Sequence, residues 1–127
     1  MINAALTARL VAAGRIGFGV ALILVPEHVT APWLGRDAGR AGTRVVSRGL
    51  GARDLALGAG ALAVAEAQLR PWVAAAIVAD AADLVSTVVA GDSLPLPGRV
   101  LVSAVASGGA VLGAIALAGL RPRPLNA

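Results

Sequence analysis

Apolar residues gather in four long stretches along the chain, and prolines, glycines and clusters of charged residues separate these stretches. Each stretch is close to the roughly 20 residues that a helix needs to cross about 30 Å of hydrocarbon. A helix also satisfies its own backbone hydrogen bonds, which lipid cannot do. The pattern predicts an all-α fold, a single domain built as an antiparallel bundle of four transmembrane helices over residues 7–25, 45–69, 72–91 and 99–120.

The connections between the predicted helices differ in length. Pro26 ends the first helix, and residues 26–44 are predicted to form a long polar loop. Only Arg70 and Pro71 separate the next two helices, which predicts a tight antiparallel hairpin. With four spans, both termini share one side of the membrane with this short connection, and the long loop shares the other side with residues 92–98. The arginines are spread over both sides and do not decide the orientation.

Composition supports a membrane location. Hydrophobic residues make up 57% of the 127 residues and charged residues 14%, whereas soluble domains have roughly 45–50% and 25%. The mean hydropathy is +0.81. Every basic residue is Arg, and the bias towards Ala, Gly, Val and Leu is typical of GC-rich bacterial genomes. We therefore expect a multi-pass protein of the bacterial cytoplasmic membrane, with a soluble helical bundle as the alternative.

The residue types that are missing exclude several kinds of chemistry. The chain has no Cys, which excludes disulfides, thiolate catalysis and Cys-ligated metals, and its single His, His28, cannot build a histidine-rich metal site. No metal site is predicted, and the cofactor is undetermined. The net charge of +4 does not indicate nucleic-acid binding, because the arginines occur singly and there are few aromatic residues on which bases could stack.

Charged residues lie in the middle of three predicted spans, which is unusual for transmembrane helices. With a rise of about 1.5 Å per residue, these residues reach a common depth of about 12–16 Å from the side of the long loop. Arg48 lies about one turn nearer that surface and is a candidate third positive partner. The predicted site is therefore a cluster of ionisable side chains from three helices: Arg15, Arg53, Asp54, Asp80 and Asp83, with Arg48 beside them.

These charges are expected to pair with one another. An unpaired charge at mid-bilayer costs about 2.5 to more than 10 kcal/mol, so such groups face each other or a wet cavity. We expect Asp54 to meet Arg15 and Arg53 to reach Asp80 and Asp83, because neighbouring positions on a helix diverge by about 100°. With Arg48 included, the cluster would be close to neutral.

The cluster has four interpretations that the sequence leaves open. It is a buried ion network that fixes helix register, a binding site for an anionic or polar ligand in a vestibule open towards residues 26–44 and 92–98, a path for protons or ions, or a catalytic site. For catalysis, Asp80 or Asp83 would be the acid or base. No nucleophile, oxyanion donor set or metal triad accompanies them.

Small residues predict the faces through which helices pack closely. Ser47, Gly51, Asp54 and Gly58 fall on one stripe of the second helix at steps of four, three and four residues. The fourth helix carries a second pair of small residues four positions apart. This pair also suggests a homodimer through Gly109 and Gly113.

Two stretches carry a resemblance to a known family. They are RIGFGVALILVP from Arg15 to Pro26, and RGLGARDLALG from Arg48 to Gly58. Together they resemble small bacterial four-helix integral membrane proteins of the DoxX-like family, mostly of unassigned function. The resemblance implies a four-helix bundle and association with quinone-linked membrane oxidoreductases, in which any redox centre belongs to a partner protein.

The sequence favours a small accessory or ligand-binding membrane subunit whose Arg/Asp cluster locks the bundle or holds a lipid, quinone or other headgroup. Its expected partners are the lipid bilayer and either a membrane complex or a second copy. Two alternatives are a small proton-coupled transporter, indicated by carboxylates near mid-bilayer, and a membrane enzyme acting on a lipid or terpenoid. Whether the protein is an enzyme is left open.

Overall fold

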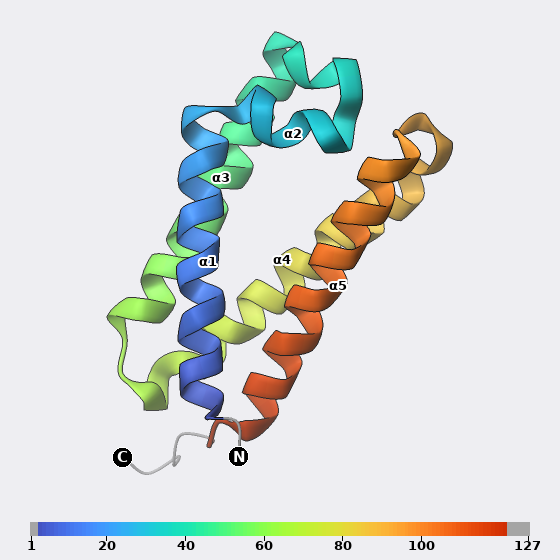
Figure 1. Cartoon of the computed structure of the whole chain (residues 1–127). Helices are drawn as coiled ribbons and strands as arrows, with labels where there is room; N and C mark the ends of the chain where they lie inside the picture. Colours follow the sequence, from blue (N-terminus) through green and yellow to red (C-terminus); the bar gives the residue numbers. More distant parts are fainter. Residues whose placement is uncertain (1–2, 122–127) are drawn as a thin grey trace.

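The protein is all-helical in the part of the chain that the structure, a computed structural model, describes: residues 3–121 contain no strand. The predicted all-α fold is therefore confirmed. Three short 3-10 turns join the helices, η1 (Gly35–Gly39), η2 (Glu66–Gln68) and η3 (Gly91–Ser93). The α-helices are α1 (Ala4–Leu24), α2 (Pro26–Leu34), α3 (Ala41–Ala63), α4 (Leu69–Ala90) and α5 (Leu96–Gly119) (Figure 1).

Local signals in the sequence set several helix ends. The Asn3 side chain accepts a hydrogen bond from the Leu6 backbone N–H (3.0 Å), as an N-cap residue does at the start of α1. Gly35 and Gly91 end α2 and α4 with φ angles of 60° and 51°, a backbone conformation that favours glycine. The chain can therefore turn sharply after both helices.

The prediction of a long polar loop over residues 26–44 is wrong. Most of this segment is helical, as α2 and η1. Pro26 does end α1, but it also occupies the first turn of α2, where a missing N–H costs no hydrogen bond and the fixed φ suits a helix. One proline thus separates two helices, and α2 runs across the far end of the molecule from the termini (Figure 1).

The long helices are arranged as two pairs. α1 packs along α3, and α4 packs along α5. The predicted tight hairpin between α3 and α4 is wrong, because α3 ends at Ala63 and the extended residues Val64 and Ala65 lead into η2. Pro71 does not form the connection; it lies in the first turn of α4. The two pairs lie close together near the termini and diverge towards α2 (Figure 1).

The predicted small-residue stripe of α3 is confirmed as a packing face, and its four residues are all buried. It faces α1: a Cβ atom added at Gly51 would lie 2.6 Å from the Gly19 carbonyl oxygen, and one added at Gly58 would lie 2.5 Å from the Ala12 carbonyl oxygen. Only the absence of a side chain allows the two backbones to approach this closely.

The small residues of α5 face α4 of the same chain. A Cβ added at Gly109 would lie 2.6 Å from Asp80 Oδ2, and one added at Gly113 would lie 2.7 Å from Ile77. The face that was predicted to bind a second copy through Gly109 and Gly113 is therefore covered within the monomer.

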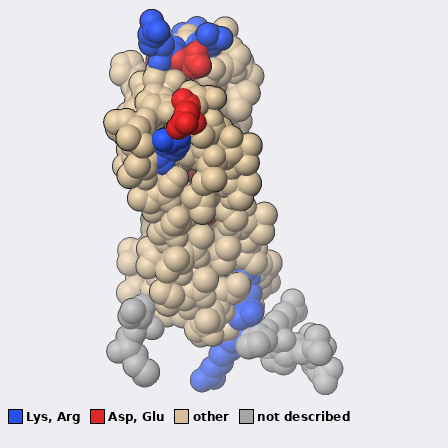
Figure 2. Space-filling model, turned by 90° about the vertical axis from the view of Figure 1, so that its right-hand side faces the viewer, with Lys and Arg blue, Asp and Glu red and all other residues tan. Residues whose placement is uncertain are grey.

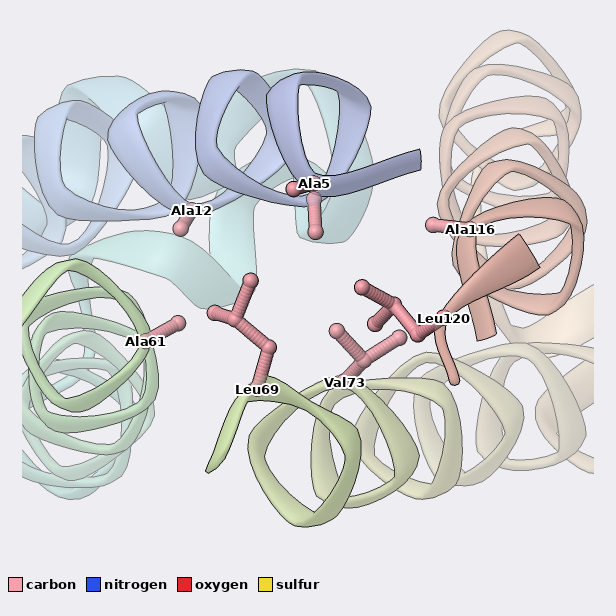
Figure 3. Packing of buried hydrophobic residues seen from close by; sticks show 8 residues of the cluster. Ala5, Ala12, Ala61, Leu69, Val73, Ala116 and Leu120 are labelled. Carbon is pink, nitrogen blue, oxygen red and sulfur yellow. The ribbon is translucent and has the colours of Figure 1, made fainter. Parts of the chain in front are cut away.

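The hydrophobic core lies at the end of the molecule where the termini are. It consists mainly of alanines of α1, α3 and α5, which surround Leu69 and Val73 at the start of α4 (Figure 3). Leu69 is fully buried. Because the alanine side chains are small, the four long helices converge here.

Two arginines strengthen this end by binding helix C-termini. Arg9 donates to the carbonyls of Leu62 and Val64 (3.2 and 3.0 Å) at the end of α3, and Arg70 donates to two carbonyls at the end of α5 (2.8 and 2.6 Å). A helix leaves its last carbonyls without partners and carries a partial negative charge there, so a guanidinium is favoured.

The surface of the described region resembles that of a membrane protein. Three helical segments are long and apolar enough to cross a membrane: Ala4–Leu24, Glu66–Ser93 and Leu96–Gly119. α3 is not among them, because it carries four charged residues. Charged side chains lie towards the two ends of the face shown in Figure 2, with a broad uncharged band between them. Large apolar side chains are exposed on the described helices, for example Leu10 (64%) and Val105 (66%).

The close approach of α1 and α3 predicts opposite effects for two neighbouring glycines. Gly51→Ala should destabilise the protein by about 1–3 kcal/mol, because the new methyl group meets backbone atoms that cannot rotate away. Gly49→Ala meets nothing within 4 Å and should be neutral or stabilising by up to about 1 kcal/mol, since Ala favours helix. Thermal unfolding in detergent, followed by circular dichroism, measures both; equal effects would contradict this packing.

Candidate functional site

Five charged side chains from three helices form one connected network near the middle of these helices. The expected meeting of charges from α1, α3 and α4 is therefore confirmed. The network consists of Arg15 of α1, Arg53 and Asp54 of α3, and Asp80 and Asp83 of α4.

Arg15 joins the two helix pairs. Its Nη1 lies 3.1 Å from Asp54 Oδ1, as predicted, and its Nη2 lies 2.5 Å from Asp80 Oδ2. Nη2 also donates to the Ala76 carbonyl oxygen of α4 (3.2 Å). The side chains of Arg15, Asp54 and Asp80 are only 10%, 5% and 12% exposed. Ion pairs this well shielded from water interact far more strongly than pairs on a surface.

Arg53 forms the second link between the pairs. Its Nη1 and Nη2 donate to the two carboxylate oxygens of Asp83 (3.0 and 2.7 Å), a bidentate geometry that fixes both side chains. Its Nε and Nη2 also donate to Asp54 Oδ1 (3.2 and 3.0 Å). Arg53 thus reaches Asp83 as predicted, but the predicted contact of Arg53 with Asp80 is wrong, because Asp80 pairs with Arg15. The contact with its neighbour Asp54 was not predicted, since the two positions diverge by about 100° on the helix.

Arg48 is not part of the network, contrary to the prediction. Its Nε donates to the Ile23 carbonyl oxygen (3.1 Å) near the end of α1, so it binds a helix C-terminus as Arg9 and Arg70 do. Without Arg48, the network alternates in sign in the order Asp80, Arg15, Asp54, Arg53, Asp83. Three carboxylates against two guanidiniums leave a formal excess of one negative charge, where near neutrality was expected.

A cavity of about 380 Å³ lies beside this network, and residues of α1 to α5 all contribute to its wall. Its volume falls within the range of about 300–1,000 Å³ that is typical of small-molecule sites. Most of the wall is apolar. The residues with polar side chains in it are Arg15, Thr30, Trp33, Asp54, Asp80 and Asp83.

Some buried polar atoms at this cavity have no hydrogen-bond partner in residues 3–121. They are the Trp33 indole nitrogen, Arg15 Nε and Asp80 Oδ2, although Asp80 Oδ2 is in ionic contact with Arg15. Such atoms are rare in folded proteins because each costs about 1–3 kcal/mol. The Thr30 hydroxyl, by contrast, donates to the Pro26 carbonyl oxygen (2.8 Å).

The cavity opens between α1 and α5, not towards the ends of the helices. Gly14 and Phe18 of α1 and Leu101 and Val105 of α5 line it and are also exposed. The side facing residues 26–44 is covered by α2, which packs so closely on α5 that a Cβ at Gly98 would overlap the backbone of α2. The predicted vestibule open towards residues 26–44 and 92–98 is therefore wrong.

The sequence gives no prediction that Trp33 and Gly14 belong to a cavity wall. Trp33 lies in the segment 26–44 that is predicted to be a loop. The spacing of Val29, Thr30 and Trp33 at three and four positions is that of a helix face and could have placed all three on one side. His28, by contrast, is exposed and does not line the cavity.

The polar groups of the cavity suit binding by charge and hydrogen bonds. Its wall contains no thiol, no imidazole and no hydroxyl other than that of Thr30. Within residues 3–121 there is no group of three or more His, Cys, Asp or Glu side chains that could hold a metal ion. What the arrangement offers to a molecule in the cavity is an apolar wall and one patch of ionised side chains.

Comparisons with family models, curated proteins and solved structures find no match to this chain. The resemblance to DoxX-like proteins stays a prediction, as does the association with quinone-linked oxidoreductases that it implies.

The charge balance of the network predicts which of its members matters most for stability. Arg15→Gln should destabilise the protein by about 3–5 kcal/mol, because it leaves Asp54 and Asp80 buried with too few cations. Asp80→Asn should cost less, since it removes the excess negative charge.

Arg99→Gln is the matched control for this experiment. Arg99 pairs with the fully exposed Asp92, so its loss should change the free energy of unfolding by about 0–1 kcal/mol. Urea or thermal unfolding in detergent measures all three variants. A cost of Asp80→Asn equal to that of Arg15→Gln would show that the excess charge has no energetic consequence.

Proposed function

We propose that this protein is a small multi-pass membrane protein that binds a lipid-soluble molecule with a polar head in the cavity beside the Arg/Asp network. One observation carries the proposal: an apolar cavity that ends on buried charges and opens sideways through an exposed apolar surface. The head would lie at the network, and the apolar body would lie along α1 and α5.

In this proposal α3 is a fourth transmembrane helix. Its 23 residues would span about 34 Å at the usual rise of 1.5 Å per residue, which is enough for the hydrocarbon core. Its buried stripe is covered by α1, and Arg53 and Asp54 are paired with charges of α1 and α4. Pairing of this kind is what makes ionised groups tolerable at membrane depth.

The position of the opening supports entry from the bilayer. Phe18, Leu101 and Val105 are 49%, 52% and 66% exposed while they line the cavity. In the membrane these side chains would face acyl chains, so a hydrophobic molecule could pass between α1 and α5 without crossing water. A lipid or a quinone has an apolar body of the required kind.

The cellular role that we propose is that of an accessory or ligand-binding subunit in the bacterial cytoplasmic membrane. Two features support it: the wall of the cavity lacks a nucleophile, and the buried charges are engaged with one another. A membrane complex with an oxidoreductase is the partner that the resemblance to DoxX-like proteins implies.

A bulky side chain at the opening should block the cavity without disturbing the fold. A Cβ at Gly14 meets nothing within 4 Å, and Gly14 lines the cavity. In Gly14→Leu the added side chain would compete with a bound molecule at a cost of about 1–3 kcal/mol, which corresponds to roughly tenfold weaker binding or more. Native mass spectrometry of the protein extracted gently from its membrane measures the small molecule that it retains.

Gly17→Leu provides the control, because Gly17 lies on the same helix, also has open space around it, and does not line the cavity. It should retain the small molecule as the unchanged protein does. Retention of the same molecule by Gly14→Leu, or a protein that carries no small molecule in any form, would contradict the proposed function.

A further inference from the structure

We infer that the polar head of the bound molecule is a cation, an ammonium group on an apolar body, held by Asp80 and Asp83, the carboxylates at the two ends of the network. This inference rests on the proposed function, because it specifies what the same cavity binds. It comes from the signs of the charges that face the cavity, from the partners that these charges already have, and from the partial exposure of Asp83.

The charged wall of the cavity is mainly negative. Asp54, Asp80 and Asp83 line the cavity with Arg15, whereas Arg53 does not. A molecule inside therefore meets three carboxylates and one guanidinium. Over the whole network, three carboxylates stand against two guanidiniums, so one negative charge has no counterion within it.

The guanidinium that lines the cavity has little to offer an anion. Both terminal nitrogens of Arg15 are engaged, one with Asp54 and one with Asp80, and only its buried Nε lacks a partner. An anionic head, such as a phosphate or carboxylate, would displace these contacts and approach two further carboxylates. The interpretation of the cluster as an anion site is therefore not favoured by the geometry.

Of the carboxylates at the two ends of the network, Asp83 is the one more open to a further hydrogen bond. Asp80 Oδ2 is buried against Arg15. Asp83 is 24% exposed and, within residues 3–121, pairs only with Arg53. An ammonium group has three N–H donors, and unlike a neutral hydroxyl it carries a positive charge that forms a salt bridge with a carboxylate. It would also supply the missing positive charge in a place with little water.

Three ten-carbon probes that differ only in the head test the inference: decylamine, decanol and decanoate, at pH 7. The chain has two tryptophans, Trp33 in the cavity wall and Trp72 at the start of α4. In Trp72→Phe, the fluorescence of Trp33 reports on the cavity alone. The protein is placed in nanodiscs of zwitterionic lipid, and partitioning is corrected with empty nanodiscs. In Trp33→Phe, the remaining Trp72 should not respond.

Decylamine should saturate the Trp33 signal at a concentration at least about tenfold lower than decanol does, and decanoate should bind more weakly than both. Adding Asp80→Asn to the same protein should reduce the advantage of the amine over the alcohol severalfold. Asp92→Asn, which removes the same charge from an exposed pair, should leave it unchanged. If Asp80→Asn does not fold, Asp83→Asn removes the charge at the other end of the network.

The possible results separate the two proposals. Equal binding of decylamine and decanol, or tightest binding of decanoate, would overturn the cationic head while showing that the cavity binds lipid-soluble molecules. An amine preference that survives in both Asp80→Asn and Asp83→Asn would also overturn it. If no probe gives a saturable signal, the proposed function fails together with the inference.

Discussion

The structure depends on the pairing of Arg15 with carboxylates from both helix pairs. Its contacts with Asp54 and Asp80 connect α1 and α3 to α4 near the middle of these helices. A buried charge that loses its partner is costly, so the two pairs keep their register. The alanine-rich contacts near the termini thus join the two pairs at one end, and the ionic network joins them again further along.

Most of the long helices, and the meeting of their charges, could be predicted from the sequence. Hydrophobic length identified the helices, and the cost of unpaired charge at one depth predicted that Arg15 and Asp54 would meet. The failures concern how the elements pack. Pro26 ends α1 and also begins α2, and a proline signals a helix end more plainly than a helix start. A short connection in sequence also does not show that two helices form a tight hairpin. Hydropathy contains no information on which helix faces which, and only the glycine stripe of α3 indicated a partner face.

The cavity was harder to predict for a related reason. Its wall combines residues from five helices that are far apart in the sequence, and no local pattern marks them as a group. Arg48 shows that closeness in sequence can also mislead. Its position near the other charged residues predicted that it would join the network, yet its Nε donates to a carbonyl of α1. An arginine near a helix end can pair with an acidic side chain or donate to the unpaired carbonyls at a helix C-terminus. The sequence alone does not distinguish these two kinds of contact.

Because α2 covers one end of the cavity, the phase in which the ligand concentration is measured affects the binding affinity that is obtained. If molecules arrive only between α1 and α5, the relevant concentration is their mole fraction in the lipid and not their concentration in water. An affinity referred to the aqueous phase would then be the product of a partition coefficient and an intrinsic binding constant within the membrane. Two ligands with the same head but different chain lengths could show very different aqueous affinities and still occupy the cavity equally at equal amounts in the bilayer.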